Sequence, residues 1–179
     1  MPLLPRRIVL VGVTGSGKST LATRIAARIG APSIAMDDLY WRPGWVKVPA
    51  ADRVPRYADI AAGERWVVDG LPKAGRPVLL PRADVVLALD YPRWLSLVRL
   101  LRRTARRLWS GERICNGNTE TLRGVVGRDS IIAWHFRSFA VVRREIAALE
   151  SVPSGPPVVR LTSQRATDAW LESLRRSLS

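Results

Sequence analysis

The sequence contains one cysteine, Cys115, among 179 residues, and one histidine, His135. A single cysteine cannot form a disulfide within the chain, and we interpret it as a reduced thiol in a cytoplasmic protein. The histidine falls on the apolar positions of a predicted helix, without another metal-ligating residue at a suitable spacing. We therefore predict a core or interface histidine rather than a metal ligand or a catalytic base.

Long apolar runs are also absent, since no stretch approaches the ~20 apolar residues of a membrane helix. The N-terminus passes directly into a strand pattern without a cleavage-site signal, so we expect no signal peptide, no membrane partner and a cytoplasmic location. With 47% hydrophobic and 25% charged residues, residues 1–179 have the composition and size of a single globular domain.

Acidic residues are scarce, at 15 against 29 basic ones, which gives a formal net charge of +14. The imbalance is concentrated in the segment 93–144, which contains 12 arginines and only three acidic residues. Such a positive field attracts anions, which include nucleotide phosphates, nucleic acid and acidic lipid.

Short apolar segments alternate with segments of helical periodicity along the chain. The predicted strands are 6–12, 33–36, 66–70, 84–90 and 158–163. The predicted helices are 19–29, 50–62, a long helix from Pro92, 129–150 with Asp129 as its N-cap, and 167–178. Residues 110–118 are predicted to form a loop. The pattern predicts an α/β fold with a five-stranded parallel sheet and helices on both faces. Ligands of such sheets bind beyond the carboxyl ends of the strands.

The long helix from Pro92 has an apolar row at Leu97, Leu101, Ala105 and Leu108. The apolar stripe at 132–149 could pack either against the sheet or against a second subunit, which leaves a homodimer open.

The segment 12–19, GVTGSGKS, fits the phosphate-binding pattern G-x-x-x-x-G-K-[ST] between a predicted strand and a predicted helix. Its glycines allow backbone amides to surround phosphate oxygens, and the helix N-terminus adds positive potential. We predict that Lys18 reaches the β- and γ-phosphates of ATP and that the Ser19 hydroxyl binds Mg²⁺. The predicted ATP-binding residues of the loop are Gly12, Thr14, Gly15, Ser16, Gly17, Lys18, Ser19 and Thr20.

Carboxylates follow two other predicted strands. Asp69 is expected to bind Mg²⁺ or to accept a hydrogen bond from Ser19, with a turn-forming role as the alternative. Asp37 and Asp38 suit a hydroxyl acceptor, because a carboxylate can accept its proton and repels a phosphate. Which of the two faces the site stays open, since either could cap a turn. Trp41 and its neighbouring aromatics could stack on a flat acceptor or fill the core.

The segment WVVDGLPK at 66–73 is similar to one in nucleoside-monophosphate kinases of the P-loop class, with Lys73 in place of an arginine. More closely, residues 6 to about 150 resemble small bacterial adenylate-kinase-related proteins called topology-modulation proteins. The resemblance rests on the phosphate loop, the DDLYW stretch at 37–41, WVVDG, DYPRWL at 90–95, NGN at 116–118 and RDS at 128–130.

The resemblance implies that the third and fourth strands flank the first, and that two mobile pieces close over the reactants. These would be an acceptor-side insert at about 38–62 and an arginine-rich lid at about 108–128. It also implies that arginines leading into the lid clamp the triphosphate and stabilise the transferring phosphoryl group; these are Arg99, Arg103, Arg106 and Arg107. A solvated helix face is the alternative for this row. Residues 163–165 would border the adenine.

These features predict an ATP-dependent phosphotransferase that moves the γ-phosphoryl group to a small-molecule hydroxyl or a nucleoside or nucleotide acceptor. Its predicted catalytic residues are Lys18, Asp37, Arg103 and Arg107, and its predicted acceptor-binding residues are Asp37, Asp38, Trp41, Asp69 and Lys73. Strict adenylate kinase activity is not expected, because Trp41 stands where those enzymes have a monophosphate-binding arginine. The alternatives are a nucleic-acid-binding ATPase that uses segment 93–144, and an ATP-bound regulatory or dimerising protein without catalysis.

Overall fold

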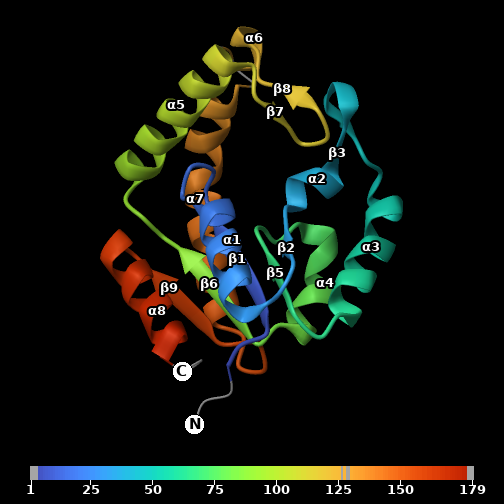
Figure 1. Cartoon of the computed structure of the whole chain (residues 1–179), viewed down its shortest axis with the longest axis vertical. Helices are drawn as coiled ribbons and strands as arrows, with labels where there is room; N and C mark the ends of the chain where they lie inside the picture. The colour runs from blue at the N-terminus through green and yellow to red at the C-terminus, as the bar shows by residue number, and fades with distance from the viewer. Residues whose placement is uncertain (1–3, 126, 128–129, 177–179) are drawn as a thin grey trace.

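The computed structural model describes residues 4–125, 127 and 130–176. At its centre lies a sheet of five parallel strands in the order β2-β5-β1-β6-β9 (Figure 1). The strands are β1 (Arg7–Gly12), β2 (Ser33–Ile34), β5 (Trp66–Val68), β6 (Val85–Leu89) and β9 (Val158–Leu161). The α/β prediction is thereby confirmed, and so is the expectation that the third and fourth of these strands flank the first.

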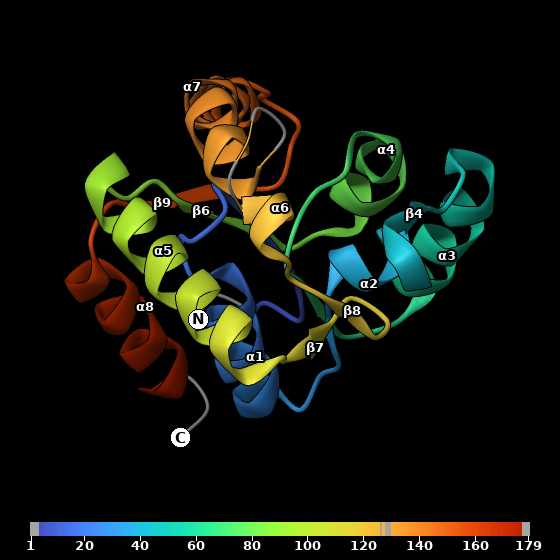
Figure 2. The same ribbon diagram turned by 90° about the horizontal axis from the view of Figure 1, so that it is seen from above.

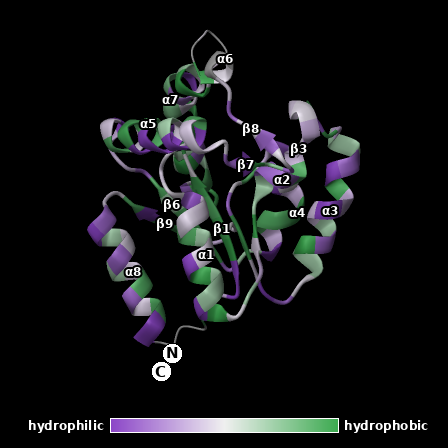
Figure 3. Ribbon diagram, turned by 45° about the horizontal axis from the view of Figure 1, so that its top comes forward, coloured by the Kyte–Doolittle hydropathy of each residue, from purple (hydrophilic) through white to green (hydrophobic). Residues whose placement is uncertain are grey.

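Helices cover both faces of this sheet, which is why the strands are apolar on both sides. One core contains Ile8, Leu10 and Leu87 under α1 (Lys18–Ile29) and α8 (Gln164–Arg176). The other contains Val9 and Val86 under α3 (Ala50–Ala62), α4 (Arg76–Leu79) and α7 (Ile131–Glu150). Figure 2 shows α1 and α8 on the side of the molecule opposite α7 and α4. Figure 3 shows apolar central strands and helices of mixed hydropathy.

The predicted strand at 33–36 is two residues too long. The strand β2 ends at Ile34, and Met36 begins a short helix, α2 (Met36–Tyr40). The side chain of Asp69 accepts a hydrogen bond from the Met36 amide at 3.0 Å, which holds this turn against the end of β5. Asp37 and Asp38 therefore belong to the first turn of a helix.

Two short hairpins were not predicted. One joins β3 (Trp41–Arg42) to β4 (Val46–Lys47) through the 3-10 turn η1 (Pro43–Trp45). The other joins β7 (Arg113–Ile114) to β8 (Asn118–Thr119), where the sequence predicted a loop. Strands of two residues are too short to show a periodicity of hydrophobic residues. The remaining short elements are α6 (Leu122–Val125), η2 (Lys73–Gly75) and η3 (Leu80–Arg82).

The long helix α5 (Arg93–Ser110) follows Pro92 as predicted, but its buried face is not the predicted apolar row. Ser96, Leu100 and Thr104 are buried, whereas Leu101 is 42% exposed. Two of the buried residues are small, and this face of α5 closely approaches the backbone at Gly15. Close approach, rather than hydrophobicity, therefore determines which side of α5 faces inward.

Helix α7 packs against the sheet through Ile146, with Val142 and Leu149 beside it. His135 is fully buried, and its Nε2 lies 2.9 Å from the Ser96 hydroxyl, which confirms its predicted place in the core. The N-cap of α7 is Ser130, whose hydroxyl accepts a hydrogen bond from the Ala133 amide at 3.1 Å.

The predicted N-cap Asp129, the predicted lid boundary at 128 and the predicted helix end at 177–178 lie outside the described residues. Among the described residues, no helix combines the length and hydropathy needed to cross a bilayer.

Candidate active site

The phosphate loop, residues 12–17, connects β1 to α1 at the carboxyl edge of the sheet and rests on α5. Gly15 has a φ of +80°, and a Cβ atom there would lie 2.3 Å from the carbonyl oxygen of Ser96. Gly17 is the N-cap of α1 in the left-handed conformation, with a φ of +96°. Glycine is needed at both positions for conformation, and at Gly15 also for the contact with α5.

Two groups in this loop suit a phosphate ligand. The hydroxyl of Ser16 is buried without a hydrogen-bond partner, which is rare unless a ligand or water supplies one. The Lys18 ammonium donates to the carbonyl oxygens of Gly12 at 2.8 Å and Val13 at 3.1 Å, so it is folded over the loop. Burial lowers the pKa of Lys18, and the carboxylates of Asp69 and Asp37 partly offset this effect. An anion at the loop would favour the charged form of the amine.

Asp69 lies directly after β5 and accepts a hydrogen bond from the side chain of Ser19 as well as from the Met36 amide. Burial raises the pKa of Asp69, and these hydrogen bonds and Lys18 oppose the shift. A hydroxyl and a carboxylate beside a phosphate site fit Mg²⁺, which prefers oxygen ligands and keeps several waters. Among the described residues, no group of three or more acidic, cysteine or histidine side chains could hold a metal alone.

Asp37 and Asp38 are both exposed, but their surroundings differ. The carboxylate of Asp37 raises the pKa of Lys18 and that of Arg103, although burial lowers both pKa values overall. The pKa of Cys115 is raised first by burial, then by Asp37 and then by Asp38. Asp37 is thus the one of the pair that interacts with the phosphate-loop lysine.

The predicted acceptor-side aromatic residue Trp41 is half-buried in a cluster on the β3–β4 hairpin. Its ring packs edge-to-face with Tyr40 at 4.9 Å and with Trp45 at 5.6 Å between centroids. Lys73 is exposed at the start of η2, in the loop after β5. Thr20 is exposed in the first turn of α1.

Two of the four predicted arginines contact the phosphate loop. Arg99 donates to the Ser16 carbonyl at 3.2 Å and to Gln164 at 2.9 Å, which brings the predicted adenine border near the loop. Arg103 donates to the Thr14 hydroxyl at 3.5 Å. Burial lowers the pKa of Arg103, and Arg107 adds to this shift. Such a guanidinium would gain from a phosphate neighbour.

The other two arginines are held by carboxylates of the segment 112–120, within the lid that the sequence predicts. Arg107 pairs with Glu120 at 3.1 Å, and both side chains are largely buried, at 18% and 11% exposure. Arg106 is 68% exposed and pairs with Glu112 at 3.0 Å. The structure therefore does not bring Arg106 to the phosphate loop. The sequence analysis assigned no role to Glu120. The only signal that could have found it is its position in the expected lid.

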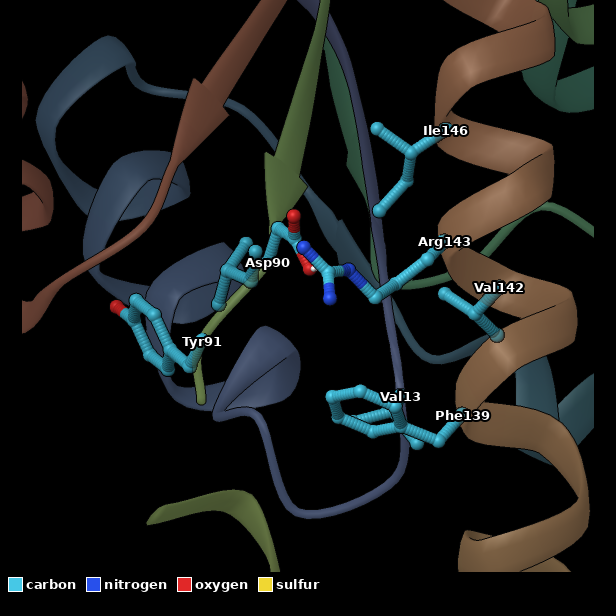
Figure 4. A pocket seen from close by; sticks show the side chains of 8 residues that line it. Val13, Asp90, Tyr91, Phe139, Val142, Arg143 and Ile146 are labelled. Carbon is cyan, nitrogen blue, oxygen red and sulfur yellow. Dashed lines mark ion pairs between the residues drawn. The ribbon is translucent and has the colours of Figure 1, made fainter. Parts of the chain in front are cut away.

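A small cavity of about 10 Å³ lies on the α7 side of the phosphate loop (Figure 4). It lies between Val13, Phe139 and the ion pair of Asp90 with Arg143, whose atoms are 3.0 Å apart. Asp90 is 5% exposed and lies 3.8 Å from a second arginine, Arg160. This space could hold about one water molecule and is too small for an acceptor.

No protein-family model and no curated protein matches this chain. Among solved structures, a gluconokinase from Sinorhizobium meliloti 1021 aligns with a TM-score of 0.51 and 21% identity, covering 98% of this chain and 96% of that one. A shikimate kinase from Acinetobacter baumannii in complex with shikimate aligns with a TM-score of 0.56 and 17% identity, covering 97% and 93%. The chain shares the fold of these two enzymes. The resemblance to topology-modulation proteins stays a prediction, since no comparison bears on it.

Proposed function

We propose that this protein is a small P-loop kinase that transfers the γ-phosphoryl group of ATP to a hydroxyl group of a small molecule. The observation that carries the proposal is the meeting of Lys18, Asp69 and Asp37 at the carboxyl edge of the sheet. Two observations support it: Asp69 accepts a hydrogen bond from the amide of Met36, the residue before Asp37, and the carboxylates of Asp69 and Asp37 both raise the pKa of Lys18 against the effect of its burial. In the proposal, Lys18 is the phosphate-binding cation, Asp69 is the metal-binding carboxylate and Asp37 is a second, exposed carboxylate.

In this proposal each side chain has a distinct task. Lys18 exchanges its two carbonyl contacts in the loop for the β- and γ-phosphates. Ser19 and Asp69 would hold Mg²⁺, and the ion would supply positive charge that offsets the phosphate oxygens. Asp37 accepts the proton of the acceptor hydroxyl while the hydroxyl oxygen forms the new bond to phosphorus. The bond between the γ-phosphorus and the bridging oxygen breaks, ADP leaves, and Arg103 stabilises the charge on the transferring group.

The charge of the acceptor wall favours a hydroxyl acceptor over a phosphate. Asp37 and Asp38 are carboxylates, and Trp41 lies where a monophosphate-binding arginine would be expected. The two aligned solved structures named above are both kinases by name, which supports small-molecule phosphorylation here. Nucleic-acid binding rests on the net charge and on the resemblance to topology-modulation proteins, and it is the alternative outcome of the test.

A panel of acceptors with radiolabelled ATP tests the proposal. The panel contains polyols, sugar acids, cyclic hydroxy acids, nucleosides, nucleoside monophosphates and duplex DNA. With the active acceptor, Asp37→Asn should lower kcat by about 100-fold or more while ATP binding is retained, because a proton acceptor is lost.

Asp38→Asn is the matched control. It removes the same charge one residue away and should change kcat by less than about fivefold. Turnover that no small molecule stimulates, or stimulation by duplex DNA alone, contradicts the proposal. Equal losses in the two variants would contradict the role of Asp37.

A further inference from the structure

Two segments that are more than 70 residues apart in the sequence are joined above the site. The β7–β8 hairpin lies beside α2 in Figures 1 and 2. At its turn, the side-chain amide of Asn116 donates to two backbone carbonyls of the acceptor side. The acceptors are the oxygens of Asp38 at 2.6 Å and Trp41 at 2.7 Å. The lid hairpin therefore contacts the residue next to Asp37.

Asn118 makes a second set of contacts and is only 4% exposed. Its amide nitrogen donates to the carbonyl of Arg42 at 3.0 Å, and its amide oxygen accepts from the backbone of Trp45 at 2.9 Å. The Trp45 indole also donates to the Thr119 carbonyl at 3.2 Å. We call the contacts of Asn116 and Asn118 with residues 38–45 the asparagine clasp. Because its acceptors on residues 38–42 are backbone carbonyls, the clasp holds the path of that chain.

The clasp is also where the backbone is strained. Among the described residues, the non-glycine residues with positive φ are Trp45 at +58°, Cys115 at +44° and Asn116 at +64°. All three lie in the clasp or beside it. Asparagine tolerates this conformation, whereas tryptophan and cysteine adopt it at a cost. Strain that persists in one small region is typical of a functional contact.

On the lid side the clasp continues directly into the residues that hold an arginine of the site. Thr119 is followed by Glu120, whose carboxylate pairs with Arg107. Arg107 lies one turn along α5 from Arg103, whose side chain donates to the Thr14 hydroxyl of the phosphate loop. A short path therefore connects the phosphate loop, through the lid, to the helix that bears Asp37.

We propose that Asn116 and Asn118 are positioning residues that couple nucleotide binding to the acceptor wall. Phosphates that hold Arg103 at the loop fix the neighbouring turn of α5, the Arg107–Glu120 pair on that turn holds the β7–β8 hairpin, and the clasp then fixes α2 with Asp37 above the γ-phosphoryl group. The proposal rests on the proposed function for the roles of these arginines and of Asp37. Its test needs only a nucleotide, so it does not depend on knowing the acceptor.

Hydrogen–deuterium exchange of the full chain, with and without Mg²⁺ and a non-hydrolysable ATP analogue, tests the coupling. In the wild type, the analogue should slow exchange at least tenfold in peptides covering residues 12–20 and also in those covering 36–47. In Asn118→Ala, protection of 12–20 should remain, whereas protection of 36–47 should fall below about threefold. Asn116→Ala should act in the same direction, and because Asn116 is exposed it covers the case in which Asn118→Ala fails to fold.

Arg42→Ala is the matched control. It removes an exposed side chain that pairs with Asp52 at 3.2 Å and keeps the carbonyl that Asn118 uses, so the coupling should persist. If the analogue protects 12–20 but leaves 36–47 unchanged in the wild type, the clasp proposal is wrong and the nucleotide site stands. The clasp proposal is also wrong if both asparagine variants keep the wild-type protection of 36–47. If 12–20 gains no protection in the wild type, the proposed function is contradicted together with the coupling.

Discussion

Replacement of Gly15 by alanine violates two requirements of this position in the phosphate loop. The first is a φ of +80°, and an alanine in the left-handed region costs about 1–2 kcal/mol. The second is space, because the new Cβ atom would lie 2.3 Å from the Ser96 carbonyl and 2.9 Å from the Leu100 side chain. Both neighbours belong to α5, so relief requires the loop and the helix to move apart.

Gly30→Ala isolates the first requirement. Gly30 is the C-cap of α1 with a φ of +63°, and a Cβ atom there would meet only the end of the Arg65 side chain at 3.8 Å. We expect Gly30→Ala to lower the free energy of unfolding by about 1 kcal/mol. Gly15→Ala should lower it by a further 1–3 kcal/mol, as overpacking does.

Urea denaturation at constant pH measures the stabilities, and titration with a fluorescent ATP analogue measures binding. Gly15→Ala should weaken nucleotide binding at least tenfold, because the displaced amides no longer converge on the phosphates. Gly30→Ala should bind as the wild type does, since it lies at the other end of α1. Equal losses of stability in the two variants, with full nucleotide binding by Gly15→Ala, would refute the reasoning about the contact with α5.

Three further outcomes are expected. The pKa of Asp84 is lowered overall, because burial, which raises it, is outweighed by hydrogen bonds from the Arg7 side chain and two backbone amides. Asp84→Asn should therefore lower the free energy of unfolding by about 2 kcal/mol in urea denaturation at pH 7. This difference should fade as the pH falls through the depressed pKa. Burial, and after it the charge of Arg93, lowers the pKa of His135, so the folded protein holds this imidazole neutral. The free energy of unfolding should therefore drop as the pH falls below about 6.5, the pKa of an unfolded histidine. His135→Gln should flatten that dependence between pH 7.5 and 5.5. Burial and Asp37 raise the pKa of Cys115 to about 11, so mass spectrometry at pH 8 should show alkylation by iodoacetamide more than tenfold slower than in the unfolded chain.

The sheet was predictable because its three central strands, β1, β5 and β6, are buried on both faces. Residues 8–11, 66–68 and 85–89 are continuously apolar, and that pattern depends little on tertiary detail. The end of β2 was not predictable in the same way. Its sequence continues as an apolar run to Met36, yet the chain turns into α2 because the Asp69 carboxylate accepts from the Met36 amide. A contact between residues 33 positions apart decided that boundary.

The inward face of α5 shows why a hydrophobic row alone can mislead. The row of Leu97, Leu101 and Ala105 predicts a packed face, but the helix must also approach the backbone at Gly15. The small Ser96 lies at that contact, and Leu101 of the predicted row turns to solvent. Sequence periodicity reports hydrophobicity and does not report which neighbour requires close contact.

The phosphate loop could be located from its motif, because spacing and context both follow from phosphate chemistry. The sequence could not show which of Asp37 and Asp38 lies nearer Lys18. That difference depends on the rotation of α2, a helix that the sequence did not reveal. The sequence also could not show which arginines of α5 contact the phosphate loop. Helical spacing puts Arg103 and Arg107 on one side of α5, but Glu112 and Glu120 pair with Arg106 and Arg107, and the sequence does not reveal those partners.

The asparagine clasp was the least predictable part of the site for a physical reason. Its bonds join side-chain amides to backbone carbonyls, so residues 38–42 carry no matching side-chain pattern. The only sequence signal was the pair of asparagines around a glycine, which favours a tight turn. If this contact completes the acceptor wall, part of acceptor specificity resides in residues 113–119. Exchanging residues 33–45 alone between related kinases should then fail to transfer acceptor preference, whereas exchanging both segments should succeed.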